Sequence, residues 1–372
     1  MILSKNPKPS FIISRSNFSL VWFGATNQFL LVQDDLDIFF SEALVQTDYE
    51  YQEAIKELVA IRPEILVLFE AISTDNTNSF SEDYLPADYS SLSKQDFYVS
   101  YLFLGQNKAS FYYNSKALQT LFLAPFTHLK TNKSKSSKEF IITKNDNKLK
   151  LFAGKKHIYS ISMDQFFVLQ AQFVNQLTEF YHSITSPNWL CSFHGCAVQK
   201  KNKSYLLLGN SGTGKSTLSS LLSFSDYRFI ADDLVLMDHD FKIYDNPAAV
   251  SVKENAWPVI ERFYKEFKTL KTSKKIKGQT KIKFLPLHTL QNNSPETFEI
   301  EALIWVHYSK NQINRLSSLD KKQALSRLIP DTWIFPKMVS AKAFANWAMG
   351  VKTYCLDYSD FNTAKKLLDA EL

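Results

Sequence analysis

Short apolar and aromatic runs, separated by polar stretches, predict most of the elements in the first half of the chain. Runs rich in aromatic and β-branched residues are typical of strands. They occur at Ser19–Gly24, Gln28–Gln33, Tyr98–Gly105, Ser110–Asn114, Glu139–Lys144 and Lys148–Gly154. Composition and apolar spacing predict helices at Tyr49–Arg62 and Asp164–Ile184. Residues 1–185 are therefore expected to form an α+β N-terminal domain.

Two polar stretches interrupt this pattern. Ser73–Asp96 is rich in Ser, Asp and Asn and predicts a long acidic loop. Leu129–Lys138 predicts a basic, low-complexity loop. Such a loop either contacts a phosphate or an acidic partner or is simply solvated, and both interpretations stay open. We expect the N-terminal domain to recognise the substrate, with these loops contributing.

From Trp189 onward, strand-like and helical patterns alternate. The predicted strands are His194–Gln199, Ser204–Leu208, Arg228–Ala231, Leu234–Met237, Phe298–Tyr308 and Thr353–Tyr358. The predicted helices are Asn255–Phe267, Lys321–Leu328, Ala341–Met349 and Phe361–Leu372, besides one that starts near Lys215. This order predicts an α/β domain over residues 189–372, with a mixed sheet rather than a purely parallel one.

A glycine loop between a predicted strand and a predicted helix is the strongest chemical signal. The chain has 9 glycines in 372 residues, and three of them fall within Gly209-Asn-Ser-Gly-Thr-Gly-Lys-Ser216. This spacing, in a strand–loop–helix context, is that of a phosphate-binding P-loop (Walker A motif). Backbone N–H groups and the helix N-terminus would bind phosphate oxygens, Lys215 would add a charge, and Ser216 would bind Mg²⁺. The residues expected to bind the nucleotide are Gly209, Asn210, Ser211, Gly212, Thr213, Gly214, Lys215, Ser216 and Thr217.

Two adjacent carboxylates end the next predicted strand, Arg228–Ala231. Asp232 and Asp233 follow Ser216 after 15 intervening residues, enough for one helix, a turn and a strand. We expect this strand to lie beside the P-loop strand. One carboxylate would then hold Mg²⁺, and the other would take a proton from an incoming hydroxyl. His194 precedes the loop by 15 residues, and both a structural role and a role near the phosphates stay open for it.

Composition narrows the class of protein. The net charge is +6, and the lysines are scattered, which fits solubility and anionic ligands better than a nucleic-acid tract. No apolar stretch is long enough for a membrane span, and the N-terminus lacks a signal-peptide core. Three cysteines without metal-ligand spacing fit a reducing cytoplasm, and Cys196 is expected to be a small buried residue.

Taken together, His194-Gly195, the glycine loop and Ile230-Ala-Asp-Asp233 resemble the catalytic domain of the HPr kinase/phosphorylase family. The HPr-kinase-related proteins found with peptide-modification clusters are more similar still. ATP-dependent phosphoenolpyruvate carboxykinases share this domain type. The resemblance covers residues 189–372. The glycine-rich signature that HPr kinases carry after the Asp-Asp motif is not found, so HPr as the substrate and phosphorolysis do not follow from the resemblance.

The resemblance implies roles for single residues. Lys215 and Ser216 would bind phosphate and Mg²⁺, Asp232 would be the general base, Asp233 the metal-side carboxylate and His194 an auxiliary. The roles of the two aspartates are open to exchange. Lysines of two segments similar to those of the related kinases are candidates for phosphate or substrate contact, with solvated lysines as the alternative. These candidates are Lys253, Lys281 and Lys283.

The sequence thus predicts a cytoplasmic kinase that uses ATP and Mg²⁺ and phosphorylates a hydroxyl, with a serine of a peptide or protein as the acceptor. A kinase for a small molecule and a regulatory protein that binds ATP without transfer are the alternatives. Neither nucleic acid nor a membrane is an expected partner. The related kinases are often oligomeric, so a homo-oligomer is an open expectation.

Overall fold

The computed structural model describes residues 6–371, except 16, 34, 74–95, 134, 186, 275–279, 292–293 and 312. The predicted acidic loop at Ser73–Asp96 lies almost wholly outside the described residues. The chain divides into two compact units. The first comprises residues 1–83, 189–192 and 319–351, and the second comprises 84–188, 193–318 and 352–372. Residues 98–181 therefore belong to the same unit as the glycine loop, whereas the sequence placed them in a separate domain.

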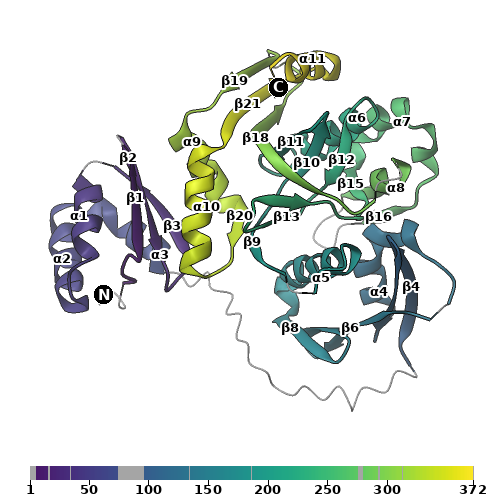
Figure 1. Ribbon diagram of the computed structural model, residues 1–372, viewed down its shortest axis with the longest axis horizontal. Helices are drawn as coiled ribbons and strands as arrows, with labels where there is room; N and C mark the ends of the chain where they lie inside the picture. Colours follow the sequence, from purple (N-terminus) through teal and green to yellow (C-terminus); the bar gives the residue numbers. More distant parts are fainter. Residues whose placement is uncertain are drawn as a thin grey trace. The chain divides into compact units, whose positions relative to one another are not determined.

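The first unit begins with an antiparallel sheet in the order β1-β2-β3, followed by three helices (Figure 1). These elements are β1 Phe11–Arg15, β2 Phe18–Phe23, β3 Gln28–Val32, α1 Asp35–Ala43, α2 Asp48–Ile61 and α3 Leu66–Ser73. Helix α2 confirms the predicted helix and starts at a capping box. Glu50 N–H donates to Thr47 Oγ1, and Thr47 N–H donates to Glu50 Oε2 at 2.7 Å. Such a box satisfies two backbone donors that the first turn leaves free.

Later segments complete the first unit. They are β9 Trp189–Phe193 up to Ser192, α9 Lys321–Leu328, β20 Thr332–Ile334 and α10 Met338–Gly350. Asn27 Nδ2 donates to the carbonyl of Ile334 at 2.7 Å, and the Phe29 and Phe344 rings lie 6.0 Å apart. Both predicted helices of this region are confirmed. None of the described helices in either unit is long and apolar enough to span a bilayer.

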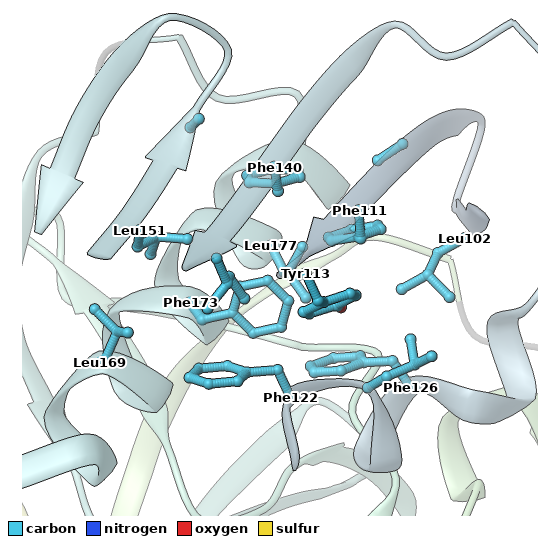
Figure 2. Packing of buried hydrophobic residues seen from close by; sticks show 14 of the residues in the cluster. Leu102, Phe111, Tyr113, Phe122, Phe126, Phe140, Leu151, Leu169, Phe173 and Leu177 are labelled. Atoms are coloured by element: carbon cyan, nitrogen blue, oxygen red, sulfur yellow. The ribbon is translucent and has the colours of Figure 1, made fainter. Parts of the chain in front are cut away.

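The second unit contains a mixed sheet in the order β4-β5-β6-β7-β8, in which β5 and β6 are parallel. Its elements are β4 Tyr98–Leu104, β5 Asn107–Tyr113, α4 Lys116–Leu123, the 3-10 helix η3 Ala124–Leu129, β6 Lys138–Asn145, β7 Lys148–Ala153, β8 Lys156–Ser162 and α5 Phe166–Tyr181. Aromatic rings join the sheet to the helices (Figure 2). Phe173 of α5 packs edge-on against Phe111 of β5 and Phe122 of α4, with ring centroids 5.8 and 5.4 Å away. The side of α5 that carries Phe173 therefore packs into the core of this unit.

A second mixed sheet of this unit carries the glycine loop. Within the unit its order is β12-β10-β11-β18-β14-β13, and β21 joins β18 on the side away from β11 and also pairs with β19. The strands are β10 Cys196–Lys200, β11 Lys203–Leu208, β12 Arg228–Ala231, β13 Val235–Asp238, β14 Lys242–Tyr244, β18 Thr297–Tyr308, β19 Arg315–Ser318 and β21 Lys352–Tyr358. Strand β18 is parallel to β11 and β21 but antiparallel to β14. The mixed α/β sheet is thus confirmed.

A small antiparallel sheet of the second unit has the order β15-β17-β16. The remaining elements are α6 Lys215–Ser223, β15 Val250–Lys253, α7 Trp257–Phe263, β16 Thr272–Lys274, β17 Lys281–Leu285, α8 Leu287–Leu290 and α11 Phe361–Glu371. The predicted helix at Asn255–Phe267 is broken, because Tyr264 leaves the helical region with φ −136° and ψ 96°. Buried apolar residues of α6, β12, β15 and β17 form one cluster, which fixes β15 against the helix behind the glycine loop.

Candidate active site

The glycine loop joins β11 to α6, as the sequence predicts. Gly209, Gly212 and Gly214 have φ values of 131°, 94° and 100°, which other residues rarely adopt. Space is a second constraint at two of them. A Cβ at Gly209 would lie 2.9 Å from the carbonyl oxygen of Val306, and one at Gly214 would lie 2.7 Å from Tyr358 Oη. The neighbouring strands β18 and β21 thus leave room only for glycine there.

Backbone contacts hold the loop in place. The N–H of Tyr308, the last residue of β18, donates to the carbonyl of Thr213 at 2.9 Å. Thr213 Oγ1 donates to the carbonyl of Asn210, also at 2.9 Å. The loop is therefore fixed by the strand beside it as well as by its own turn.

Lys215 is the first residue of α6 and is 7% exposed. Its Nζ donates to the carbonyl of Gly209 and, at 3.3 Å, to that of Asn210. A buried ammonium requires acceptors of this kind. The charge therefore lies inside the curve of the loop, at the end of the helix where unpaired N–H groups already favour an anion.

The paired carboxylates follow β12, but β12 does not lie beside the P-loop strand. Strand β10 runs between them and pairs antiparallel with both. The expectation that the two strands are neighbours is therefore wrong, because β10, which precedes β11 in the chain, lies between them. Strands β11 and β12 still point the same way, so Asp232 reaches the first turn of α6.

Asp232 is 6% exposed and is held at both oxygens. Its Oδ1 accepts from Ser216 Oγ at 2.9 Å and from Cys196 Sγ at 2.7 Å, and its Oδ2 accepts from the N–H of Ser251 at 3.3 Å. Burial and the nearby charge of Asp233 raise the pKa of Asp232 to about 7, against the opposing effect of these hydrogen bonds. A carboxyl group whose pKa lies near 7 beside a glycine loop of this kind is typical of a functional position.

Cys196 is buried, as the sequence predicts, but it also contributes to the site. Its Sγ donates to Asp232 and lies 3.9 Å from Ser216 Oγ. Burial raises the pKa of this thiol, and the carboxylate of Asp232 adds to the effect, so the group is a neutral donor. No pattern in the sequence indicates this contact, because it depends on β10 lying between β11 and β12.

The structure places the other two polar candidates at exposed positions. Asp233 directly follows Asp232 and has a positive φ of 65°, an uncommon conformation that Asp tolerates better than most residues. His194 lies in the exposed turn between β9 and β10. The strand after His194, β10, pairs with the P-loop strand, and Cys196 lies opposite Leu207.

The three candidate lysines have different surroundings. Lys253, at the end of β15, donates from Nζ to Ser211 Oγ of the glycine loop at 2.8 Å. Lys283 is buried, and its Nζ donates to the carbonyls of Phe267 and Lys268 at 3.1 and 2.8 Å. Lys281 is exposed on the same strand, β17. Only Lys253 is thus brought to the loop, and the backbone contacts of Lys283 are of a structural kind.

A second buried cluster joins the helix α5 region to the strands below the site. The fully buried carboxylate of Asp245 accepts from His288 Nε2 at 3.0 Å. His182 Nε2 lies 2.9 Å from Asp245 Oδ1 and 2.8 Å from its backbone carbonyl oxygen. Tyr181 Oη lies 3.1 Å from His288 Nε2. Burial raises the pKa of Asp245, but the hydrogen bonds from the two histidines and the N–H of Glu296 outweigh it and lower that pKa overall. Nothing in the local sequence pattern indicated this cluster.

Comparison with known proteins gives a remote structural likeness. No protein-family model and no curated protein matches the chain. Among solved structures, the chain is similar to the HPr(Ser) kinase/phosphatase from Coxiella burnetii, at 11% identity and a TM-score of 0.23. The match covers 48% of this chain and 94% of that one. A likeness this remote carries no functional inference, so any function has to be argued from the site itself.

Proposed function

We propose that the protein is an ATP-dependent phosphotransferase that moves the γ-phosphate to a hydroxyl group, with a serine of a peptide or protein as the acceptor. The contact of 2.9 Å between Ser216 Oγ and Asp232 Oδ1 carries this proposal. It lies at the first turn of the helix that follows the glycine loop. Burying a carboxylate there is costly, and simple phosphate binding would not require it.

The loop fits a nucleotide phosphate chain. Its glycines take φ values that turn successive N–H groups toward one concavity, which binds anionic oxygens. Lys215 adds a charge inside the loop, and Lys253 brings a second one to Ser211 at its rim. Both side chains can exchange their present oxygen acceptors for phosphate oxygens without leaving the loop.

The oxygens beside the loop also fit Mg²⁺, which binds a few protein oxygens together with phosphate and water. Ser216 and Asp232 supply a hydroxyl and a carboxylate that already lie in contact. These two residues would hold the ion, which when bound neutralises charge on the phosphate oxygens. This reverses the roles that the resemblance implies and leaves Asp233 as the candidate base.

In this proposal, Asp233 accepts the proton of the acceptor hydroxyl while the hydroxyl oxygen attacks the γ-phosphorus. The bond between that phosphorus and the β,γ-bridging oxygen breaks, and ADP leaves. Asp233 is exposed, so an acceptor from solution can approach it. Lys215 stays with the phosphates, and the fixed loop keeps the donor in place. Positioning and charge neutralisation of this kind account for most of the catalysis in phosphoryl transfer.

ADP release from the full chain tests the proposal, with ATP, Mg²⁺ and a library of serine-containing peptides. The variants are Lys215→Met, Asp232→Asn and Asp233→Asn, with Asp240→Asn at an exposed turn as the control. We expect all but the control to lose at least about a hundredfold in rate. Release with a metabolite pool but not with peptides would replace the peptide acceptor by a small molecule. Tight ATP binding without turnover on any acceptor would refute transfer.

Magnesium dependence separates the two aspartates. If Asp232 is on the cation side, Asp232→Asn raises the Mg²⁺ concentration needed for half-maximal binding of a fluorescent ATP analogue. Asp233→Asn then lowers kcat and leaves that concentration unchanged. The opposite result would restore the roles implied by the resemblance.

A further inference from the structure

Residues 98–162, the basic lobe, have a larger net positive charge than the whole chain. This stretch has eleven lysines and no arginine, and its carboxylates are Glu139 and Asp146. Its net charge of +9 exceeds the +6 of the whole chain, so the remaining residues sum to −3. An asymmetry of this size indicates an electrostatic partner rather than general solubility.

Most of these lysines face solvent. The exposed ones are Lys108, Lys116, Lys130, Lys133, Lys135, Lys144, Lys148, Lys155 and Lys156. In the described part of the chain, none of the nine forms an ion pair with a carboxylate. By contrast, Lys200, Lys242 and Lys352 of the glycine-loop sheet each pair with an Asp or Glu. Among the described residues, no carboxylate is thus paired with these nine lysines.

Four of the exposed lysines gather at one end of the lobe's sheet. The loop after η3 starts at the edge of β4, where the backbone of Lys130 forms an antiparallel β-bridge with that of Leu102. It ends at β5, where the N–H of Ser137 donates to the carbonyl of Lys108 at 2.9 Å. Lys108 Nζ in turn lies 6.0 Å from the ring of Phe103, which is 46% exposed. The basic edge consists of Phe103, Lys108, Lys130, Lys133 and Lys135.

This edge is attached to the candidate active site. The 3-10 helix η3 directly precedes Lys130, and its Pro125 carbonyl accepts from the N–H of Ala249 at 2.8 Å. Two residues later, Ser251 N–H contacts Asp232. Lys253, two residues further, reaches the glycine loop. The basic lobe therefore holds the strand that lines the phosphate site.

We infer that the basic edge binds an acidic segment of the phosphate acceptor, a peptide with Asp and Glu near its serine. This inference rests on the proposed function and names its substrate class. Lysines on flexible stems act as point charges and suit carboxylates spread along a peptide, whereas arginine, the usual reader of nucleic-acid phosphates, is missing from the lobe. The exposed Phe103 ring adds apolar contact among the charges.

Fluorescence anisotropy with the full chain tests the inference directly. The probe is a labelled peptide of seven Glu-Ser-Gly repeats, compared with its Lys-Ser-Gly counterpart and with a single-stranded oligonucleotide. The test variant combines Lys130→Gln, Lys133→Gln and Lys135→Gln. The matched control combines Lys201→Gln, Lys337→Gln and Lys366→Gln, which removes the same charge from exposed positions outside the lobe.

We expect the acidic peptide to bind in a salt-dependent manner, and the test variant to weaken that binding about tenfold while the control stays within about twofold. Equal binding by test and control variants, equal binding of the acidic and basic peptides, or tighter binding of the oligonucleotide would each overturn the inference. Binding of a fluorescent ATP analogue and ADP release are measured separately on the same variants. Peptide binding without ADP release would refute the proposed function but not the surface, and release that ignores peptide charge would refute the surface alone.

Discussion

Replacing Asp245 by Asn tests whether the buried cluster stabilises the second unit. The side chain has no exposed surface, and both its oxygens are used. Oδ1 accepts from the N–H of Glu296 at 3.0 Å, and Oδ2 accepts from His288 Nε2 at 3.0 Å. His182 Nε2 lies 2.9 Å from Oδ1 and 2.8 Å from the backbone carbonyl oxygen of Asp245. An amide of the same shape keeps one acceptor oxygen and turns an NH₂ group toward a donor.

The expected loss follows from these contacts. Hydrogen bonds to a charged group contribute about 1.5–3 kcal/mol each. In the variant, the amide oxygen is a weaker acceptor than a carboxylate oxygen, and the NH₂ group faces a donor at the other position, whichever way the amide is turned. Leaving a buried donor without its acceptor costs about 1–3 kcal/mol more. We therefore expect Asp245→Asn to lower the free energy of unfolding by about 3–5 kcal/mol at neutral pH.

The sign of the pH dependence follows from the lowered pKa of Asp245. In the unfolded chain this carboxyl titrates near its ordinary value of 3.8, and in the folded protein it titrates below that value. The folded state therefore binds fewer protons in the acid range, and the stabilisation is complete above the unfolded pKa. It is lost as the pH falls through the lowered folded pKa, so wild type and variant should converge in acid.

Urea unfolding followed by tryptophan fluorescence measures the difference at several pH values. Asp240→Asn, at an exposed turn, is the matched control and should change the unfolding free energy by less than about 0.5 kcal/mol. A loss below about 1 kcal/mol for Asp245→Asn at neutral pH would refute the reasoning. So would a difference from wild type that grows as the pH is lowered.

Three further predictions concern single positions. Burial lowers the pKa of His128 to about 4, so wild type is fully stable above the unfolded pKa of 6.5 and loses stability as the pH falls toward 4. In urea unfolding, His128→Leu should make this loss of stability smaller by up to about 3 kcal/mol. An unchanged loss in the variant would contradict the prediction. Cys196→Val removes the donor to Asp232 and should lower kcat about tenfold in ADP release, while Cys196→Ser retains the rate; equal rates for both variants would show that the contact is dispensable. Gly214→Ala places a Cβ 2.7 Å from Tyr358 Oη at a φ of 100° and should abolish binding of a fluorescent ATP analogue. The control Gly154→Ala has a φ of 60° and open space around it, so it should cost only about 1 kcal/mol of stability.

The sequence predicts local features of the site well and non-local ones poorly. The glycine loop is contiguous, and its strand, turn and helix are adjacent in the chain, so spacing alone identifies it. Asp232 follows Ser216 in the sequence after 15 residues, which is the length of one helix, a turn and one strand. Cys196 was missed as a contact because its place depends on the strand order β12-β10-β11, which apolar patterns do not encode.

Buried polar clusters are the other limit of sequence-based prediction. His182, Asp245 and His288 come from three distant segments, and each alone resembles an ordinary surface residue. Lys283 shows the converse, because a lysine in a basic segment is buried under two backbone carbonyls. Its burial depends on how β17 packs against the 3-10 helix η6, Lys265–Thr269, whose residues supply both carbonyls. The division of the chain into units has the same origin, since the sheet at 98–162 packs with residues more than a hundred positions away.

The segment from Asp245 to Lys253 connects the parts on which both proposals depend. It begins in the buried histidine cluster, contacts η3 of the basic lobe through Ala249, touches the carboxylate site through Ser251 and ends on the glycine loop. A stretch this short cannot shift at one contact without straining the others. Loosening it at Asp245 should therefore affect phosphate binding and peptide binding together, whereas neutralising the basic edge should affect peptide binding alone.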